Sequence, residues 1–242
     1  MPTDATHGDR RWADRAASLY DESYARRYRA RDNELETTRS NQELIGWLGG
    51  VCDRFDNAID VLDLGCGTGR YFWGLRRLKS LTGLDASDAM LAQAREPIHG
   101  ERLAGVPMTL VAGDVMNHLF SAGSFDLVYS IGVLAEHVPL TQATVDRVSA
   151  WLRPGGRFAF TTVHPKSPSV SRPLTRRLAE TATDMLPRAV TAALHRRLVV
   201  DGMYADERWI SKLLAGRLVI ESLERFASDV HLHGRCVARK AV

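Results

Sequence analysis

An aspartate followed by three closely spaced glycines carries the clearest chemical signal in this chain of 242 residues. Asp63 lies in the apolar run of residues 61–64, and Gly65, Gly67 and Gly69 follow at alternate positions. Glycine is required where φ is positive or where the backbone must approach a ligand closely. The pattern therefore predicts a strand that leads into a nucleotide-binding turn.

The charge at this turn indicates which kind of nucleotide it suits. No Lys-Ser or Lys-Thr pair follows the last glycine, and Arg70 stands where the dinucleotide fingerprint needs its third glycine. The Asp63 carboxylate would repel a pyrophosphate, but it suits the α-ammonium and sulfonium groups of S-adenosylmethionine (SAM). We expect Asp63, Gly65 and Gly67 around the methionine part of SAM, with Gly69 in the same cofactor-binding turn.

Acidic residues also end the next two predicted strands. The strand at residues 81–85 ends at Asp85, which is placed to accept both ribose hydroxyls. The strand at residues 108–115 closes on Asp114 and Val115, which we expect to bracket adenine. Met90, in a helix expected from residue 88 to 95, either packs on the adenine face or belongs to the core.

Five segments occur in an order and at a spacing typical of one family: DLGCGTG, GLDAS, GDV, SFDLVYS and LRPGG. From about residue 20 to its end, the chain resembles class I SAM-dependent methyltransferases of the small-molecule type. The resemblance implies a doubly wound α/β fold with a seven-stranded, mainly parallel sheet in the order 3-2-1-4-5-7-6, the last strand being antiparallel. It also implies that Ser130 offers its backbone carbonyl to the α-ammonium group. Tyr20 and Tyr28 would belong to a helical lid over SAM, although core contacts would also explain both tyrosines.

The remaining elements follow from hydrophobic periodicity and turn residues. We expect helices at residues 12–31, 41–52 and 138–151, and a fourth strand at 124–130. A helix exit and a Pro-Gly-Gly turn should precede the fifth strand within residues 152–163, and the last strands should lie at 218–225 and 235–240. The expected division is an N-terminal arm and lid at 1–40 and a methyltransferase domain at 41–242, with a helical, substrate-selecting insertion at 166–204.

Histidines are the candidate bases, because an unactivated acceptor must lose a proton during methyl transfer. His137 follows the fourth strand, His164 follows the fifth, and His231 and His233 lie in the predicted hairpin between the sixth and seventh strands. The topology predicts that these loops open on one rim of the sheet. Each histidine also has a plain structural explanation, and the sequence does not single out one base.

The composition favours a globular enzyme that methylates an O or N atom of a small molecule, although carbon is not excluded as the acceptor atom. The polar first residues, the absence of a long apolar run and three cysteines without a CxxC pair predict a cytoplasmic protein with no metal and no membrane association. Arginines gather in the N-terminal arm and the insertion, at a net charge of +3. Methylation of RNA or protein is therefore the alternative, with nucleic acid the less favoured partner. The sequence does not distinguish a monomer from a homodimer.

Overall fold

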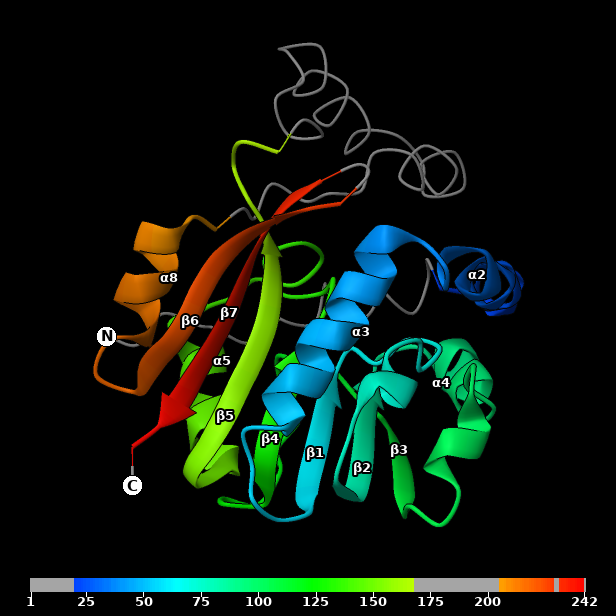
Figure 1. Ribbon diagram of the computed structural model, residues 1–242, viewed down its shortest axis with the longest axis horizontal. Coiled ribbons are helices and arrows are strands. Elements are labelled where there is room, and N and C mark those ends of the chain that lie inside the picture. The colour runs from blue at the N-terminus through cyan, green and yellow to red at the C-terminus, as the bar shows by residue number, and fades with distance from the viewer. Residues whose placement is uncertain (1–19, 168–204, 229–230, 242) are drawn as a thin grey trace.

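A single seven-stranded sheet forms the centre of the computed structural model, which describes residues 20–167, 205–228 and 231–241. Its strand order is β3-β2-β1-β4-β5-β7-β6 (Figure 1). Strand β7 is antiparallel to both of its neighbours, and the other pairs are parallel. This arrangement confirms the predicted fold class. The strands are β1 (Ile59–Leu64), β2 (Leu78–Asp85), β3 (Met108–Ala112), β4 (Phe125–Ser130), β5 (Leu152–Val163), β6 (Leu218–Ala227) and β7 (Leu232–Lys240).

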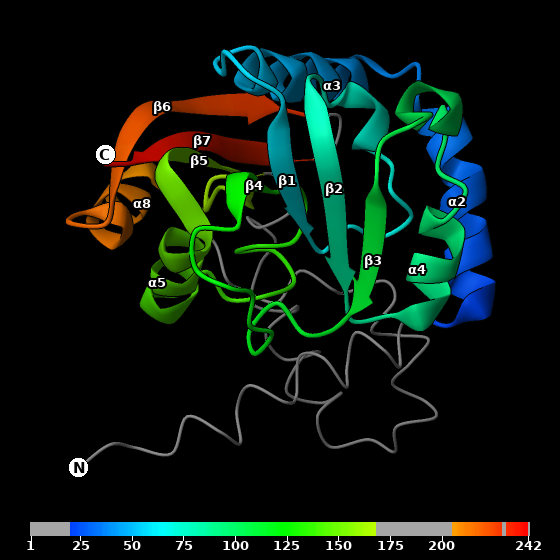
Figure 2. The same ribbon diagram turned by 90° about the horizontal axis from the view of Figure 1, so that it is seen from below.

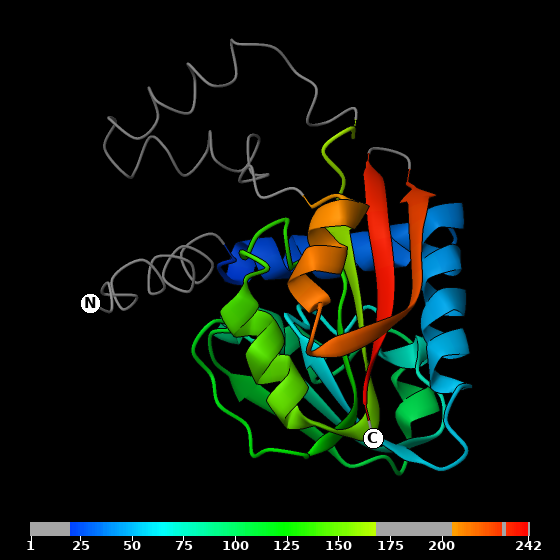
Figure 3. The same ribbon diagram turned by 90° about the vertical axis from the view of Figure 1, so that its left-hand side faces the viewer.

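Helices cover both faces of the sheet. The described helices are α2 (Glu22–Leu35), α3 (Arg39–Cys52), α4 (Asp88–Ala94), α5 (Gln142–Trp151) and α8 (Glu207–Leu214), with short 3-10 turns at Phe72–Gly74 and Gly100–Leu103. Figure 3 shows α3, in blue, on one side of the sheet and α5 and α8, in green and orange, on the other. Figure 2 shows α2 beside α4, near the β3 edge of the sheet.

Two apolar cores result, one on each face. Leu48 of α3, Phe72 and Val61 belong to one cluster, whereas Leu62 of β1 and Val148 of α5 belong to the other. Side chains alternate between the two faces of a strand, so a central strand covered on both sides is apolar at nearly every position. Every residue of β1 is accordingly buried, including its aspartates.

The boundaries of two predicted elements were wrong. Helix α5 begins at Gln142, because Thr141 caps it by accepting a hydrogen bond from the Thr144 amide. The Pro-Gly-Gly turn does not precede β5. The strand starts directly after α5, and the turn is an irregularity inside it, between the pairs Phe125–Leu152 and Leu127–Arg157.

The ends of the chain differ from prediction in a similar way. Helix α2 starts at Glu22, where Asp21 accepts a hydrogen bond from the Tyr24 amide, and it continues to Leu35. The predicted helical residues 12–19 and most of the predicted insertion, from 168 to 204, lie outside the described residues. Strands β6 and β7 are longer than predicted, so His233 lies within β7 and not in the hairpin loop.

Candidate functional site

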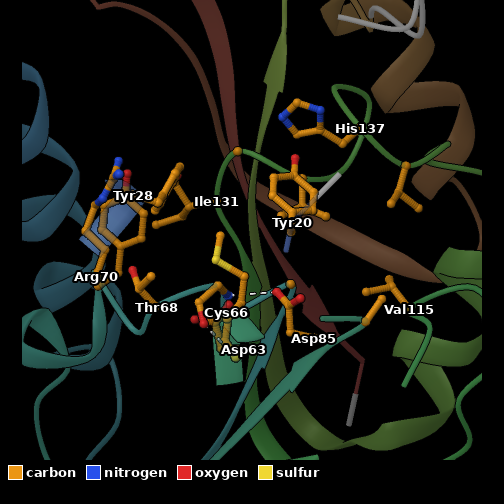
Figure 4. Close-up of a pocket in the computed structure, with 18 of the residues that line it drawn as sticks. Tyr20, Tyr28, Asp63, Cys66, Thr68, Arg70, Asp85, Val115, Ile131 and His137 are labelled. Carbon is orange, nitrogen blue, oxygen red and sulfur yellow. Dashed lines mark hydrogen bonds between the residues drawn. The ribbon is translucent and has the colours of Figure 1, made fainter. Parts of the chain in front are cut away.

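A cavity of about 230 Å³ lies where the carboxyl ends of the central strands face α2. Ligands of doubly wound folds bind at this edge of the sheet. Its walls come from the end of β1, the loops after β2, β3 and β4, and the tyrosine-bearing face of α2 (Figure 4). The lining residues are Tyr20, Tyr24, Tyr28, Asp63, Gly65, Cys66, Gly67, Thr68, Arg70, Tyr71, Asp85, Ala86, Met90, Asp114, Val115, Ile131, Gly132, Val133, His137 and Val138.

The three glycines of the turn after β1 all have positive φ, but they have different surroundings. A Cβ on Gly67 would contact only the Met90 methyl group, at 3.8 Å, so this glycine faces open cavity. A Cβ on Gly65 would lie 2.5 Å from Val133, and one on Gly69 would lie 2.7 Å from Phe72. Gly65 and Gly67 therefore line the cavity, whereas Gly69 lies outside it and allows the turn to pack.

Asp85, at the end of β2, is held in place by backbone donors. Its two carboxylate oxygens accept hydrogen bonds from the Gly67 amide, at 2.8 Å, and from the Ser87 amide, at 2.9 Å. Each oxygen keeps acceptor capacity for a ligand hydroxyl. Ser87 caps α4 by accepting a hydrogen bond from the Met90 amide, and this cap fixes Met90 in the cavity wall.

The loop after β3 supplies Asp114 and Val115. The Asp114 carboxylate accepts hydrogen bonds from the Met116 amide and from the Asn117 side chain, at 2.8 and 2.6 Å. Val115 is almost fully buried and packs into the core of the α5 face. Figure 4 shows Val115 on the far side of Asp85 from the glycine turn. This order along the cavity matches the order expected for methionine, ribose and adenine.

Asp63 lies in the cavity floor and is only 3% exposed. Burial raises the pKa of its carboxyl group to about 8; Tyr129 opposes the shift, and the nearby charge of Asp85 adds to it. A carboxylate that burial disfavours in this way is stabilised by a cation, because opposite charges favour the ionised form.

Helix α2 is bound to the glycine turn by a buried carboxylate that the sequence did not reveal. Asp32 is fully buried and accepts hydrogen bonds from the Thr68 hydroxyl and, at 2.5 Å, from Arg70 Nε. The Arg70 guanidinium group also lies 4.6 Å from the centre of the Tyr28 ring, within the range of a cation–π contact. Arg70 follows Gly69 directly, but its partner is 38 residues away, so spacing could not show the pair.

The predicted lid tyrosines both line the cavity, together with Tyr24 between them. Burial raises the pKa of Tyr20 and of Tyr28, so both phenols remain protonated at neutral pH. The Tyr20 carbonyl accepts a hydrogen bond from Ser87, which ties the start of α2 to the Asp85 loop. In Figure 4, the Tyr20 hydroxyl points toward His137.

Ser130 does not line the cavity. It is fully buried, and its hydroxyl donates a hydrogen bond to the Leu64 carbonyl at 2.8 Å. The residues that follow, Ile131, Gly132 and Val133, form the cavity wall instead. Strand β4 thus ends at Ser130, as predicted, and the cavity-lining residues begin one position later.

The four candidate histidines do not converge on the cavity. Only His137 lines it. His164 is 3% exposed and uses both ring nitrogens: Nδ1 accepts from the Lys166 amide, and Nε2 lies 3.3 Å from Glu207. With Ala205, whose amide donates to the Val163 carbonyl, this contact joins the end of β5 to the start of α8.

His231 and His233 form a small cluster beside the cavity wall. Their rings lie 5.5 Å apart, His233 stacks on Phe226, and its Nε2 lies 3.1 Å from the Ser228 hydroxyl. Burial lowers the pKa of His233, and Glu136 opposes that shift, so this carboxylate lies within electrostatic reach of the ring.

The described residues contain neither a membrane-spanning helix nor a metal-binding cluster. None of the helices there is long and apolar enough to cross a membrane. No group of three or more His, Cys, Asp and Glu side chains among these residues is arranged to hold a metal ion.

Comparisons with known proteins agree with the fold. Residues 61–156 match a family described as a methyltransferase domain. The chain is 34% identical over 126 residues to a ubiquinone biosynthesis O-methyltransferase of Cronobacter sakazakii, covering 50% of each chain. It is 33% identical over 102 residues to a sterol 24-C-methyltransferase of Debaryomyces hansenii, covering 41% of this chain and 26% of the relative. The chain thus spans half or less of the length of these relatives.

Among solved structures, the fold is similar to that of magnesium protoporphyrin IX methyltransferase from Synechocystis PCC 6803 with bound SAH. The TM-score is 0.65 at 17% identity, covering 95% of this chain and 100% of the other. The sheet order and the cavity define the class I methyltransferase fold. The segment that matches the methyltransferase-domain family extends from β1 into β5.

Proposed function

We propose that this protein is a SAM-dependent methyltransferase acting on an O or N atom of a small molecule. One observation carries the proposal. Along the cavity lie first the buried carboxyl group of Asp63, whose ionised form a cation would stabilise, and Gly67, whose Cα faces empty space. The carboxylate of Asp85 and the loop that holds Asp114 and Val115 follow. SAM, the cofactor of the family, has a cationic amino-acid part, a ribose and an adenine in that same sequence.

The cavity residues suit the parts of SAM as follows. Asp63 and Gly67 hold the methionine part, and Asp85 accepts the ribose hydroxyls. Met90 and Val115 enclose adenine, with Asp114 beside them. Arg70, which no motif had indicated, offers a positive charge to the methionine carboxylate at the opposite end of the cavity (Figure 4). Tyr20 and Tyr28 cover the cofactor.

SAM supplies an electrophilic methyl group on a sulfonium. The acceptor's lone pair forms the new bond to carbon while the sulfur–carbon bond breaks, its electron pair remains on sulfur, and the acceptor loses a proton. His137 is the residue we assign to receive this proton, because it lines the cavity and its buried Nδ1 has no hydrogen-bond partner in the described part of the chain. Its Nε2 lies 3.8 Å from Glu136 Oε1.

The relatives differ in the acceptor atom, because one is named as an O-methyltransferase and the other as a C-methyltransferase. Proximity and orientation supply most of the rate in such a displacement, so the acceptor must fill the space beside His137 closely. We further infer a cytoplasmic location, because all three cysteines are buried free thiols, as a reducing compartment allows.

The test is a screen of small hydroxyl and amine acceptors that measures SAH formation. The wild-type protein should turn over at least one acceptor, His137→Ala should lower kcat by about 10²–10⁴-fold, and SAM binding should be retained. If SAM binds but no acceptor in a broad panel yields SAH, the protein is a SAM-binding protein without transfer activity, and the proposal fails.

The alternative, an RNA or protein substrate, rests on the arginines of the N-terminal arm and the insertion. Most of the predicted clusters lie outside the described residues. On α2, Arg26 faces Glu22 and Arg29 donates to the Glu96 carbonyl. Binding of RNA that weakens steeply with salt would revive this alternative.

A further inference from the structure

The turn between β4 and α5 places a carboxylate beside the cavity without a partner. Oε2 of Glu136 is buried and has no hydrogen-bond partner in the described part of the chain, and the side chain as a whole is 13% exposed. Its other oxygen, Oε1, faces His137 Nε2 at 3.8 Å. A buried polar atom left unpaired costs free energy, so an unpaired carboxylate oxygen beside a binding cavity calls for a ligand that supplies the missing donor.

The backbone of this turn is shaped to hold Glu136 in that position. Gly132 and Ala135 have φ of +73° and +53°, and the amides of His137 and Val138 both donate to the Val133 carbonyl. For a residue with a Cβ, such as Ala135, the left-handed conformation is sterically unfavourable. Contacts around the turn must maintain it, and residues held in such conformations gather at functional sites.

Gly132 is a part of the cavity wall that lies close to the carboxylate. This glycine lines the cavity, and a Cβ placed on it would have Glu136 Oε2, at 3.9 Å, as its only neighbour within 4 Å. The oxygen therefore lies directly behind a part of the wall that has no side chain. Because Oε2 is enclosed in the free protein, a donor group on a bound molecule would have to displace this part of the wall, at Gly132, to reach it.

The charges around this place are mostly negative. The carboxyl groups of Asp63, Asp85 and Asp114 line the same cavity, and Arg70 is the one permanent cation among the described residues that line it. Arg70 is itself paired with the buried Asp32. The other ionisable groups that face Glu136 are His137, His233 and the phenols of Tyr20 and Tyr71. Among the described residues that line the cavity, no unpaired permanent cation is available to offset the charge of an anionic acceptor.

We propose that Glu136 is an acceptor-binding residue that takes a hydrogen bond from a hydroxyl or amino group of the methyl acceptor. The site therefore selects neutral or cationic acceptors over carboxylates and phosphates. This inference rests on the proposed function, since it assigns the acceptor side of the same cavity. His137 then receives the proton of the reacting group while Glu136 holds a donor of the same molecule.

The experiment compares two catechols that differ in charge, 3,4-dihydroxybenzylamine and 3,4-dihydroxybenzoate. Each is titrated calorimetrically into the SAH complex of the full chain, after SAH binding has been measured on its own. The variants are Glu136→Gln and, as a matched control, Glu101→Gln, whose carboxylate is 73% exposed beside His99. Glutamine keeps the size of the side chain and removes its charge.

The wild-type protein and Glu101→Gln should bind the amine at least about tenfold more tightly than the benzoate, as expected for one charge-assisted hydrogen bond. Glu136→Gln should lose most of that preference and keep its affinity for SAH. Equal binding of the two catechols, a preference that survives in Glu136→Gln, or no binding of the amine to a formed SAH complex would each overturn the inference. Absence of SAH binding would instead count against the proposed function.

Discussion

Asp63 is the residue whose chemistry is most sensitive to the ligand. It is enclosed in the cavity floor, and burial raises its pKa to about 8. In the free protein the carboxyl group is therefore mainly protonated at neutral pH. Its ordinary pKa is 3.8, so between about pH 4 and 8 the folded protein holds one more proton than the unfolded chain. Stability from this group falls as the pH rises through that range.

The same linkage makes cofactor binding depend on pH. In the proposed site SAM binds the ionised form of Asp63, so below about pH 8 a proton must be released on binding. We expect the dissociation constant for SAM to fall as the pH rises from 6 to 8, by up to about tenfold per unit. Calorimetric titrations across that range measure it.

Asp63→Asn is the control for this prediction. The variant should bind SAM more weakly at pH 8, and its remaining pH dependence should be shallower. Identical slopes in the two proteins would show that another group is responsible.

At the scale of elements, the position of α2 depends on one buried ion pair. Asp32 is fully buried, and the Arg70 side chain is 14% exposed. Removing one member of a buried pair leaves the other charge without compensation, which costs about 3–5 kcal/mol. The pair also joins α2 to the glycine turn, so the loss should extend to the cofactor site.

We therefore expect Asp32→Asn to lower the free energy of unfolding by about 3–5 kcal/mol and to weaken SAM binding. The matched control is Asp53→Asn, because Asp53 pairs with Arg76 while both side chains are about half exposed. The control should lose less than about 1 kcal/mol. Chemical denaturation of both variants measures the difference, and equal midpoints would contradict the role given to Asp32.

The glycine turn offers a second comparison between matched positions. Gly65 and Gly123 both have positive φ, of 78° and 64°, but a Cβ on Gly65 would overlap Val133, whereas one on Gly123 would meet nothing within 4 Å. Gly123→Ala should cost about 1–2 kcal/mol from backbone strain alone. Gly65→Ala should cost about 1–3 kcal/mol more, because Val133 must move into the cavity, and it should impair SAM binding.

Thermal unfolding and SAH titration of the two glycine variants provide the measurement. If both variants unfold at the same temperature and bind SAH equally well, the close contact between Gly65 and Val133 is unimportant.

At the scale of the whole molecule, the sequence predicted the sheet better than the site. Apolar runs that end in an acid or a glycine indicate the parallel strands. The sequence therefore predicts the positions of Asp63, Asp85 and Asp114 at strand ends, and all three line the cavity. The central strands β1 and β4 are buried on both faces, so their apolar residues form nearly continuous runs in the sequence. The ends of the strands were predicted less accurately. His233 was expected in the hairpin loop, but it lies within β7.

What the sequence could not reveal depends on contacts between distant elements. Asp32 lies in a charged, exposed-looking helix, and only the packing of α2 on the glycine turn buries it. Likewise, the four histidines are near strand ends as expected, but the side-chain directions separate them. His164 points to α8, and only His137 reaches the cavity. Tertiary packing determines the direction of each side chain, so the spacing of residues along the chain cannot predict it.

The most direct test of the account is calorimetric titration of SAM and SAH into the purified full chain. The wild-type protein should bind both ligands with dissociation constants on the order of micromolar, and Asp85→Ala should lose binding because the ribose acceptor is removed. Asp56→Ala, at an exposed position away from the cavity, should bind as the wild type does. If the folded wild-type protein binds neither ligand, or if Asp85→Ala binds both unchanged, the cavity is not the cofactor site and the proposed function is wrong.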